Sequence, residues 1–264
     1  MKKLPKTTDC ILDLSEGWLT IWFNRPEKRN ALSVGLINDI MLTLESIYED
    51  RSVRGVIFRG KEKFFCSGAD LESLKQIDSA GKNSKNIAIN MSMKVGELFK
   101  AISTAPQITI SAIEGIAMAG AFGIACATDF LVTMSNTKYA LTETKIGLTP
   151  AQVAPYVINR LGFAKAKRLM LTGMAFSGQE AFEMGMADYV ANTELEFSEQ
   201  IKSIREQANK CAPNAVAVTK KIINSHYTID TKEASSLFAN SVINDEGLEG
   251  LASFFKKRKP YWNK

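Results

Sequence analysis

Two stretches of small residues mark places where another molecule could reach the main chain. "FFCSGADL" covers residues 64–71, and "GIAMAGAFGIACATDF" covers 115–130. Each contains a glycine-bearing turn between a strand-like and a helix-like segment, so each could leave a backbone N–H free for a ligand oxygen. Two such groups aimed at one carbonyl oxygen would form an oxyanion hole, which stabilises charge developing in acyl chemistry. The alternatives are a strand-to-helix turn capped by Asp70 and a closely packed core helix.

The side chains available for acid–base and metal chemistry are few. His226 is the single histidine, which argues against a histidine-ligated metal site and against Ser–His or Cys–His nucleophilic chemistry. We expect His226 to be structural and any general acid or base to be a carboxylate. The cysteines are widely spaced and form no CxxC pair, so we expect reduced, mostly buried thiols in a cytoplasmic protein: Cys10, Cys66, Cys126 and Cys211.

Strand and helix patterns alternate through most of the 264 residues. Strands are predicted over 10–24 (two strands joined around Glu16-Gly17), 53–60, 106–115 and 130–143 (two short strands). Helices are predicted over 33–50 (with Ser33 as N-cap), 85–104, 151–171 and 177–185. The polar stretch 76–86 predicts a mobile surface loop, and from about 195 the chain reads as helical. The sequence therefore predicts an α/β fold with an all-helical C-terminal region.

Positive charge gathers at 25–30, "RPEKRN", and at 254–264, "FFKKRKPYWNK", although the net charge is only +5. Such a tail is either a solvated terminus or a clamp on a phosphorylated small ligand. No interleaved aromatic or Gly-rich motif accompanies the charge, so we expect no nucleic-acid partner. No apolar run approaches the roughly 20 residues of a membrane span, and acidic residues interrupt the N-terminus, so neither a membrane segment nor a secretory signal is expected.

Five ordered motifs resemble the crotonase superfamily, the enoyl-CoA hydratases and isomerases: "NRPEKRNALS", "FCSGADL", "AIEGIAMAGAFGIACATDF", "YALTETKIGLTP" and "TGMAFSGQEAFEMGMADYV". The resemblance spans residues from about 10 to 262. It implies a core of repeated ββα turns over 1–195 and a C-terminal helical oligomerisation region over 196–264. It also implies coenzyme A thioester substrates, with coenzyme A as part of the substrate and no prosthetic group or metal. The expected assembly is a homotrimer or a dimer of trimers.

Carried over by position, the resemblance places the two oxyanion donors on the N–H groups of Ala69 and Gly120. It places an acid–base carboxylate at Glu143. A second glutamate, usual in hydratases of the family three residues after the oxyanion glycine, is replaced here by Gly123. A mechanism with one carboxylate is the natural inference.

Three activities fit this pattern. The leading one is addition of water to a 2-enoyl-CoA with Glu143 as acid and base, provided another group positions the water. The second is a Δ3–Δ2 enoyl-CoA isomerase that uses the same residue. The third is a non-catalytic acyl-CoA-binding protein, against which the retained Glu143 argues. The segment 145–162 and the "GAFG" pattern resemble hydratases that act on branched glutaconyl-CoA thioesters, with Gly123 and Leu148 in the expected substrate pocket.

Coenzyme A is expected to lie against two basic groups. Lys28 and Arg29 match the family's basic position near the adenine pocket, and Lys257, Arg258 and Lys259 match a C-terminal cluster that often reaches a phosphate from a neighbouring subunit. The residues assigned to the coenzyme are Lys28, Arg29, Ala31, Ser67, Gly68, Asp70, Lys257 and Lys259.

Overall fold

The structure is a computed structural model that describes residues 4–225 and 230–263. His226, expected to be structural, lies outside the described residues. Cys10, Cys66 and Cys126 are buried and Cys211 is exposed, which confirms that the thiols are mostly buried. Among the helices described, none combines the length and the apolar character that a membrane crossing requires.

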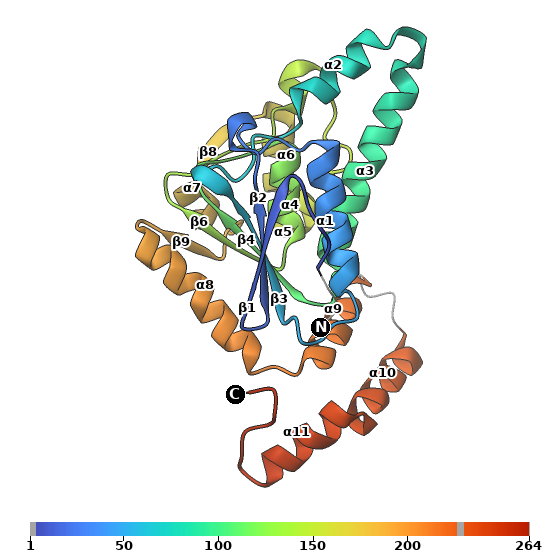
Figure 1. Cartoon of the computed structure of the whole chain (residues 1–264), viewed down its shortest axis with the longest axis vertical. Helices are drawn as coiled ribbons and strands as arrows, with labels where there is room; N and C mark the ends of the chain where they lie inside the picture. The colour runs from blue at the N-terminus through green and yellow to red at the C-terminus, as the bar shows by residue number, and fades with distance from the viewer. Residues whose placement is uncertain (1–3, 226–229, 264) are drawn as a thin grey trace.

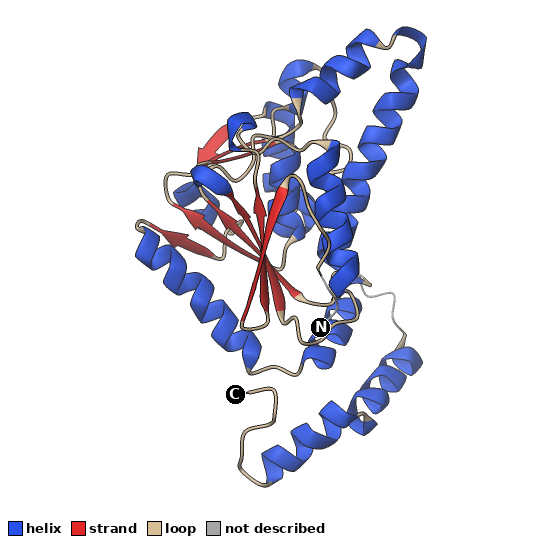
Figure 2. Cartoon of the chain, in the orientation of Figure 1, coloured by secondary structure: helices blue, strands red, loops and turns tan. Residues whose placement is uncertain are grey.

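A six-stranded sheet forms the centre, in the order β1-β2-β3-β4-β6-β9 (Figures 1 and 2). β1 and β2 are antiparallel, and the other neighbours are parallel. Glu16 and Gly17 join β1 to β2 with φ of 52° and 78°, as a two-residue hairpin turn requires. The strands are β1 Cys10–Ser15, β2 Trp18–Phe23, β3 Gly55–Gly60, β4 Ile108–Ile113, β6 Phe130–Met134 and β9 Tyr189–Ala191.

A second, three-stranded sheet consists of β5 (Ile116–Met118), β7 (Lys138–Ala140) and β8 (Ala175–Ser177). Strands of the large sheet are followed by a short pairing in this second layer and then by a helix. β4, β5 and helix α4 (Gly120–Ala127) make one such unit, and β3 followed by the bridge at Cys66 makes another. These units confirm the crotonase-like α/β fold with repeated ββα turns.

Helices cover both faces of the large sheet because successive residues of each buried strand point to opposite sides. On β3, Val56 and Phe58 pack in the core formed with α1, α3, α4, α5 and α6, whereas Ile57 packs in a second cluster with α8. The remaining helices of this part are α1 Val34–Ile47, α2 Leu71–Ser79, α3 Ser84–Thr104, α5 Ala154–Leu161, α6 Phe163–Thr172, α7 Gly178–Glu183 and α8 Glu194–Asn209. Short 3₁₀ helices are η1 Pro26–Lys28, η2 Lys61–Lys63, η3 Gly81–Asn83 and η4 Glu143–Ile146.

The C-terminal region is helical as predicted. α8 packs on the sheet, α9 (Pro213–Asn224) lies at the lower end of the core, and α10 (Thr231–Ile243) and α11 (Asp245–Phe255) extend away from it (Figure 1). We call residues 230–263 the arm. The division predicted at 195 falls at the start of α8, a helix that belongs to the core by its packing.

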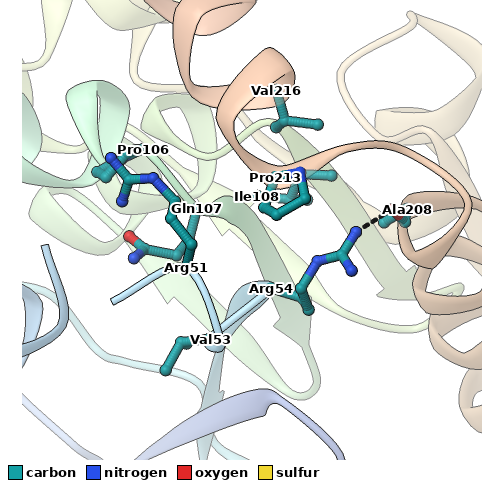
Figure 3. Close-up of a pocket in the computed structure, with 9 residues that line it drawn as sticks. All are labelled: Arg51, Val53, Arg54, Pro106, Gln107, Ile108, Ala208, Pro213 and Val216. Carbon is teal, nitrogen blue, oxygen red and sulfur yellow. Dashed lines mark hydrogen bonds between the residues drawn. The ribbon is translucent and has the colours of Figure 1, made fainter. Parts of the chain in front are cut away.

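A cavity of about 10 Å³ lies where the chain before β3 meets α8 and α9 (Figure 3), which is too small for a ligand. Its Arg54 side chain donates hydrogen bonds to the carbonyl oxygens of Ala208 and Cys211, and more weakly to that of Trp262 at 3.4 Å. This guanidinium thereby ties the end of α8 to the end of the arm.

Two predicted elements differ in the structure. The helical segment predicted over 151–171 is divided between α5 and α6 at Gly162, which has a φ of 74° that glycine adopts readily. The loop predicted over 76–86 is wrong, because α2, η3 and the start of α3 occupy it. Its polar composition reflects the exposure of two packed helix ends, which the Ser84 Oγ hydrogen bond to the Ile77 carbonyl (2.6 Å) joins.

Candidate active site

The two glycine-bearing turns lie side by side. Cys66 forms a parallel bridge with Ala117, and the Met118 N–H donates to the Cys66 carbonyl at 3.2 Å. Leu32 lies against both predicted donors, because it forms a parallel bridge with Ala69 and a Cβ atom at Gly120 would lie 2.9 Å from its Cδ1 atom. The two predicted donors therefore come from neighbouring chain segments.

The N–H groups of these two residues are unpaired. Within residues 4–225 and 230–263, neither the Ala69 N–H nor the Gly120 N–H donates a hydrogen bond to a protein acceptor. The flanking amides are engaged, because the Asp70 N–H donates to the Leu32 carbonyl and the Ala119 N–H donates to the Ala140 carbonyl. Adjacent free N–H groups at the start of a helix suit an oxygen that carries negative charge.

The backbone is strained at this point of the chain. Ala119, immediately before α4, has φ 48° and ψ −116°, a conformation costly for a residue with a Cβ atom. Gly68 has a φ of 98°, and a Cβ atom there would come within 2.9 Å of the Met118 carbonyl oxygen. The close approach of the two turns therefore requires a glycine at 68.

Glu143 reaches the same edge of the small sheet. β5 and β7 are parallel with Met118 paired to Ala140, so the chain leaves both strands in the same direction. Gly120 follows β5 and Glu143 follows β7 as the first residue of η4. The Leu148 N–H donates to the Glu143 carbonyl at 2.9 Å and closes the turn behind it.

The Glu143 carboxylate lies in a poorly solvated position. Its Oε2 atom is buried and has no hydrogen-bond partner among the described residues. Burial raises the pKa of Glu143, although a hydrogen bond from its own backbone N–H opposes the shift. A raised pKa makes the carboxylate a stronger base, which favours the proton uptake that general acid–base catalysis requires.

The two residues expected in the substrate pocket have different surroundings. Gly123 is buried one turn along α4 from Gly120, and a Cβ atom at Gly123 would lie 2.3 Å from Cζ of Phe99. Phe99 therefore fills the space in which a side chain at 123 would start. Leu148 is 47% exposed, and it lies with the exposed Ile146 in the turn that follows Glu143.

The expected coenzyme-binding residues near the N-terminus form one compact loop pair. The Ser67 N–H donates to the Arg29 carbonyl, and the Leu32 N–H donates to the Gly68 carbonyl. Lys28 is exposed and pairs with Glu72 of α2 at 3.2 Å. These contacts bring the loop around Lys28 against the turn that contains Ala69.

Arg25, which the sequence analysis did not identify, forms hydrogen bonds with Asp70 and Ala31 of the expected coenzyme set. Arg25 donates to the Ala31 carbonyl and to Asp70 Oδ2, both at 2.8 Å, while Asp70 Oδ1 accepts the Glu72 N–H at the start of α2. Burial favours a higher pKa for Asp70, but the hydrogen bonds from Arg25 and from the Glu72 N–H outweigh it and hold the pKa below its usual value. Arg25 stands in the motif that suggested Lys28 and Arg29, yet nothing local identifies Asp70 as its partner.

Asn30 was also missed, although it is completely buried with a φ of 54°. Its Oδ1 accepts the Arg25 N–H at 2.8 Å, and its Nδ2 donates to the carbonyl oxygens of Lys61 and Phe64. Asn30 thus joins the loop after β2 to the loop after β3.

The C-terminal basic residues lie far from Lys28 within one chain. Lys257 and Lys259 are exposed beyond α11, at the opposite end of the molecule from α2, against which Lys28 pairs (Figure 1). Arg258 forms a two-pronged ion pair with Glu249 at 2.6 and 2.7 Å. The structure does not bring the two expected basic groups together in a single copy.

Comparison with known proteins connects this site to one family. The family model described as "Enoyl-CoA hydratase/isomerase" matches residues 13–264. Human "Enoyl-CoA hydratase domain-containing protein 2, mitochondrial" is 32% identical over 254 residues, which are 93% of this chain and 85% of that protein. Mouse "Methylglutaconyl-CoA hydratase, mitochondrial" is 28% identical over 255 residues, 93% of this chain and 79% of that protein. The solved structure of Pseudomonas aeruginosa AtuE matches with a TM-score of 0.93 and 32% identity, covering 97% of this chain and all of that one.

Proposed function

The chain belongs to the enoyl-CoA hydratase/isomerase family, and from this premise we propose that it adds water to a 2-enoyl-CoA. The observation that carries the proposal is Glu143, a carboxylate with a buried, unpartnered oxygen at the edge of the small sheet from which the free Gly120 N–H also emerges. The substrates of this family are coenzyme A thioesters, and we assign coenzyme A to the substrate and not to a resident cofactor.

The N–H groups of Ala69 and Gly120 bind the thioester oxygen in this proposal. Their shared neighbour Leu32 and their lack of protein acceptors support the assignment. The dipole of α4 adds to the attraction when negative charge develops on that oxygen. Each donor of such a pair is worth roughly 3 kcal/mol of transition-state stabilisation.

Glu143 moves the proton. Its carboxylate takes a proton from water as the water oxygen attacks C3, and the C2=C3 electrons shift through the carbonyl carbon onto the thioester oxygen. The enolate so formed is held by the two N–H groups until Glu143 returns the proton to C2. Water is added across the double bond, and Glu143 ends in its starting state.

The coenzyme is assigned to two basic groups. Lys28 and Arg29 contact it from the same chain, with Ala31, Ser67, Gly68 and Asp70 forming the backbone frame that supports them. Lys257 and Lys259 reach its phosphates from a neighbouring copy in a homotrimer or a dimer of trimers. The separation of the two groups within one chain supports the role of a second copy. The cytoplasm remains the proposed compartment, although two of the relatives are named as mitochondrial.

The acyl group is assigned to the turn after Glu143, where Leu148 and Ile146 are exposed, and to the surroundings of Gly123. A branched glutaconyl thioester is the proposed substrate class. It is supported by the "GAFG" pattern, by the segment 145–162 and by the mouse relative named as a methylglutaconyl-CoA hydratase. A thioester of this class carries its own carboxylate, and the absence of a glutamate at 123 avoids repulsion between two negative groups.

An isomerase is the second candidate, because one carboxylate is sufficient for it. Glu143 would take a proton from C2 of a 3-enoyl-CoA and return it to C4, while the same N–H pair held the intermediate enolate. The phenyl ring beside Gly123 favours this alternative, since it offers no polar group to hold water.

The deciding experiment assays the purified protein against crotonyl-CoA, a 3-enoyl-CoA and a methyl-branched glutaconyl-CoA, with product analysis. Water addition to the branched thioester is the expected result. Glu143→Gln should bind acyl-CoA normally and lose about 10²–10⁴-fold in turnover, because the amide keeps the shape without a transferable proton. Unchanged turnover in this variant would remove Glu143 from the mechanism, and normal binding without turnover in the parent would indicate an acyl-CoA-binding protein.

A further inference from the structure

The ring of Phe99 fills the space into which a side chain at Gly123 of α4 would project. An added Cβ at Gly123 would lie 2.3 Å from Cζ, 2.7 Å from Cε2 and 2.9 Å from Cε1 of the ring. Contacts this short do not occur between real atoms, so even an alanine at 123 requires the ring to move. Phe99 and Gly123 are both buried.

The space that the ring fills is next to the proposed oxyanion site. Residues three apart on a helix lie on the same face, so Gly123 lies directly behind Gly120. An added Cβ at Gly120 would meet only Leu32 Cδ1, at 2.9 Å, whereas at Gly123 it meets the ring. A side chain at 123 would therefore start where the ring now lies, one helical turn from the Gly120 N–H that the proposed function assigns to the thioester oxygen.

The ring is fixed from more than one side. Phe99 contacts Tyr156 of α5 edge to face, with ring centroids 5.5 Å apart. One turn earlier on α3, the Gln152 amide fills the space beside Gly96 and donates a hydrogen bond to Ser92 Oγ at 3.2 Å. These contacts hold α3 against both α4 and α5, and close packing of this kind does not yield to an extra side chain without a loss of stability.

We propose that Phe99 is a specificity-determining residue: it reserves the space beside Gly123, keeps a second polar group out of the site and leaves Glu143 to act alone. The inference rests on the proposed function. According to this proposal, the residues at positions 99 and 123 together determine the reaction outcome. The two positions lie on different helices, and position 123 alone does not decide the outcome. We therefore expect the parent protein to hydrate crotonyl-CoA slowly, because no second polar group beside Glu143 holds the water.

The test is a double-mutant cycle on Gly123→Glu and Phe99→Ala, assayed with crotonyl-CoA. Gly123→Glu alone should lower the melting temperature and give no gain in hydration. The double variant should hydrate crotonyl-CoA at least tenfold faster than Phe99→Ala alone. Its kcat/KM profile should show a second carboxyl ionisation, which a merely structural effect would not produce.

Two further comparisons distinguish the proposed role of Phe99 from a general loss of folding. Gly123→Ala should lower the melting temperature when Phe99 is present and have little effect in a Phe99→Leu background. Phe58 of β3 is also fully buried, so Phe58→Ala is the matched control. It should not raise the crotonyl-CoA hydration rate of Gly123→Glu.

The outcomes separate the two proposals. Three results would each overturn the role of Phe99. They are a well-folded Gly123→Glu protein with raised hydration, equal destabilisation by Gly123→Ala in both backgrounds, and a double variant that is no faster than Phe99→Ala. A parent protein that neither binds nor converts any enoyl-CoA, while the melting-temperature coupling is present, would overturn the proposed function and with it the specificity role.

Discussion

The buried position of the Glu143 carboxylate lowers the stability of the folded protein but favours proton transfer. A buried carboxylate oxygen without a hydrogen-bond partner is unfavourable for the folded state, because burial removes water without supplying a replacement. The same burial raises the pKa of the group toward the range in which it can both take and give a proton. Residues that are costly to keep and useful in chemistry are typical of active sites.

This conflict predicts that Glu143→Gln stabilises the protein at neutral pH. Because the pKa of Glu143 is higher in the folded than in the unfolded chain, the folded protein binds more protons between the two values. The parent therefore loses stability as the pH rises through that window. The variant has no such dependence, so its advantage in melting temperature should grow from near pH 4 to a plateau above the folded pKa.

Thermal unfolding of both proteins between pH 4 and pH 8 measures the effect. Glu27→Gln, at an exposed position, is the control and should show no growing difference. A constant difference between parent and Glu143→Gln over the whole range would contradict the buried position of the carboxylate.

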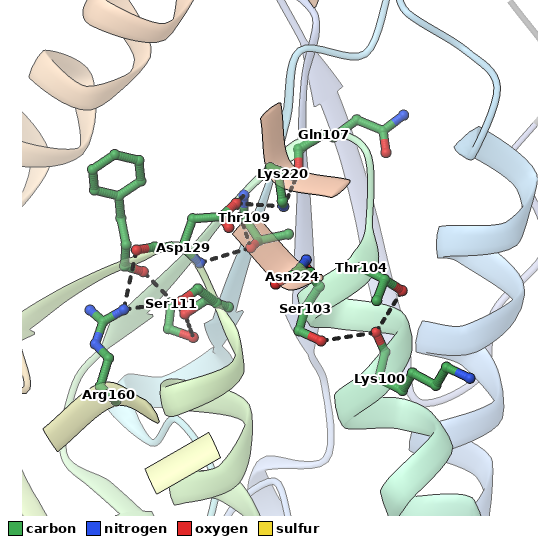
Figure 4. A network of polar contacts seen from close by, with 12 residues as sticks. Lys100, Ser103, Thr104, Gln107, Thr109, Ser111, Asp129, Arg160, Lys220 and Asn224 are labelled. Carbon is green, nitrogen blue, oxygen red and sulfur yellow. Dashed lines mark hydrogen bonds and ion pairs between the residues drawn. The ribbon is translucent and has the colours of Figure 1, made fainter. Parts of the chain in front are cut away.

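At the scale of elements, an ion pair between the buried Lys220 and the partly buried Asp129 attaches α9 to the sheet (Figure 4). Lys220 of α9 donates to Asp129 Oδ2 at 2.6 Å and to the Gln107 carbonyl at 2.7 Å. The same carboxylate oxygen accepts the N–H and the hydroxyl of Thr109. Burial lowers the pKa of Lys220, and Asp129 opposes this shift. The pair thus joins the starts of β4 and β6 to the first helix after α8.

Lys220→Met should destabilise the protein by about 3 kcal/mol, because it leaves Asp129 partly buried without its cation. Adding Asp129→Asn should cost less than the sum of the two single substitutions, since they remove the same interaction. Denaturant unfolding gives these values. Lys202→Met removes an exposed ion pair on α8 and serves as the control, with an expected change below about 0.5 kcal/mol. Equal effects of the two lysine substitutions would refute the anchoring role.

At the scale of the whole molecule, the arm exposes more apolar surface than a solitary chain would be expected to leave. Phe238, Ile243, Leu248, Leu251, Phe254 and Phe255 are all exposed on α10 and α11. The arm is nevertheless attached at defined points. The buried carboxylate of Glu246 accepts the N–H of Asn214 at the start of α9, and Trp262 Nε1 donates to the Lys210 carbonyl. An attached arm with an uncovered apolar face is suited to packing against another copy.

The combined variant Phe254→Asp/Phe255→Asp should therefore sediment as a monomer, whereas the parent should sediment as a trimer or a hexamer. If the neighbouring copy also supplies Lys257 and Lys259, the monomer should show a raised KM for CoA thioesters and a normal KM for a pantetheine thioester. Phe163→Asp, at an exposed position on α6, should leave assembly intact. A parent that stays monomeric at micromolar concentration would exclude the proposed assembly.

Local sequence patterns determined most of the elements, and they suggested the chemical type of the proposed site. The β1–β2 hairpin, the cap of α1 by Ser33 and the two glycine-bearing turns depend on neighbouring residues, whose preferences are readable from the chain. The assignment of Glu143 came from the motif resemblance and not from a local preference. The polar stretch at 76–86 shows the limit, because exposed helix ends and loops have similar compositions.

Only the tertiary structure decided how these pieces meet. The pairing of Cys66 with Ala117 brings the two glycine-bearing turns together, Arg25 reaches Asp70, and Phe99 fills the space beside Gly123. Each of these contacts joins residues far apart in the chain, and no local pattern specifies which distant side chain occupies a given space. Packing assigned the space beside Gly123 to the ring from another helix, because a close-packed interior leaves room for only one of them.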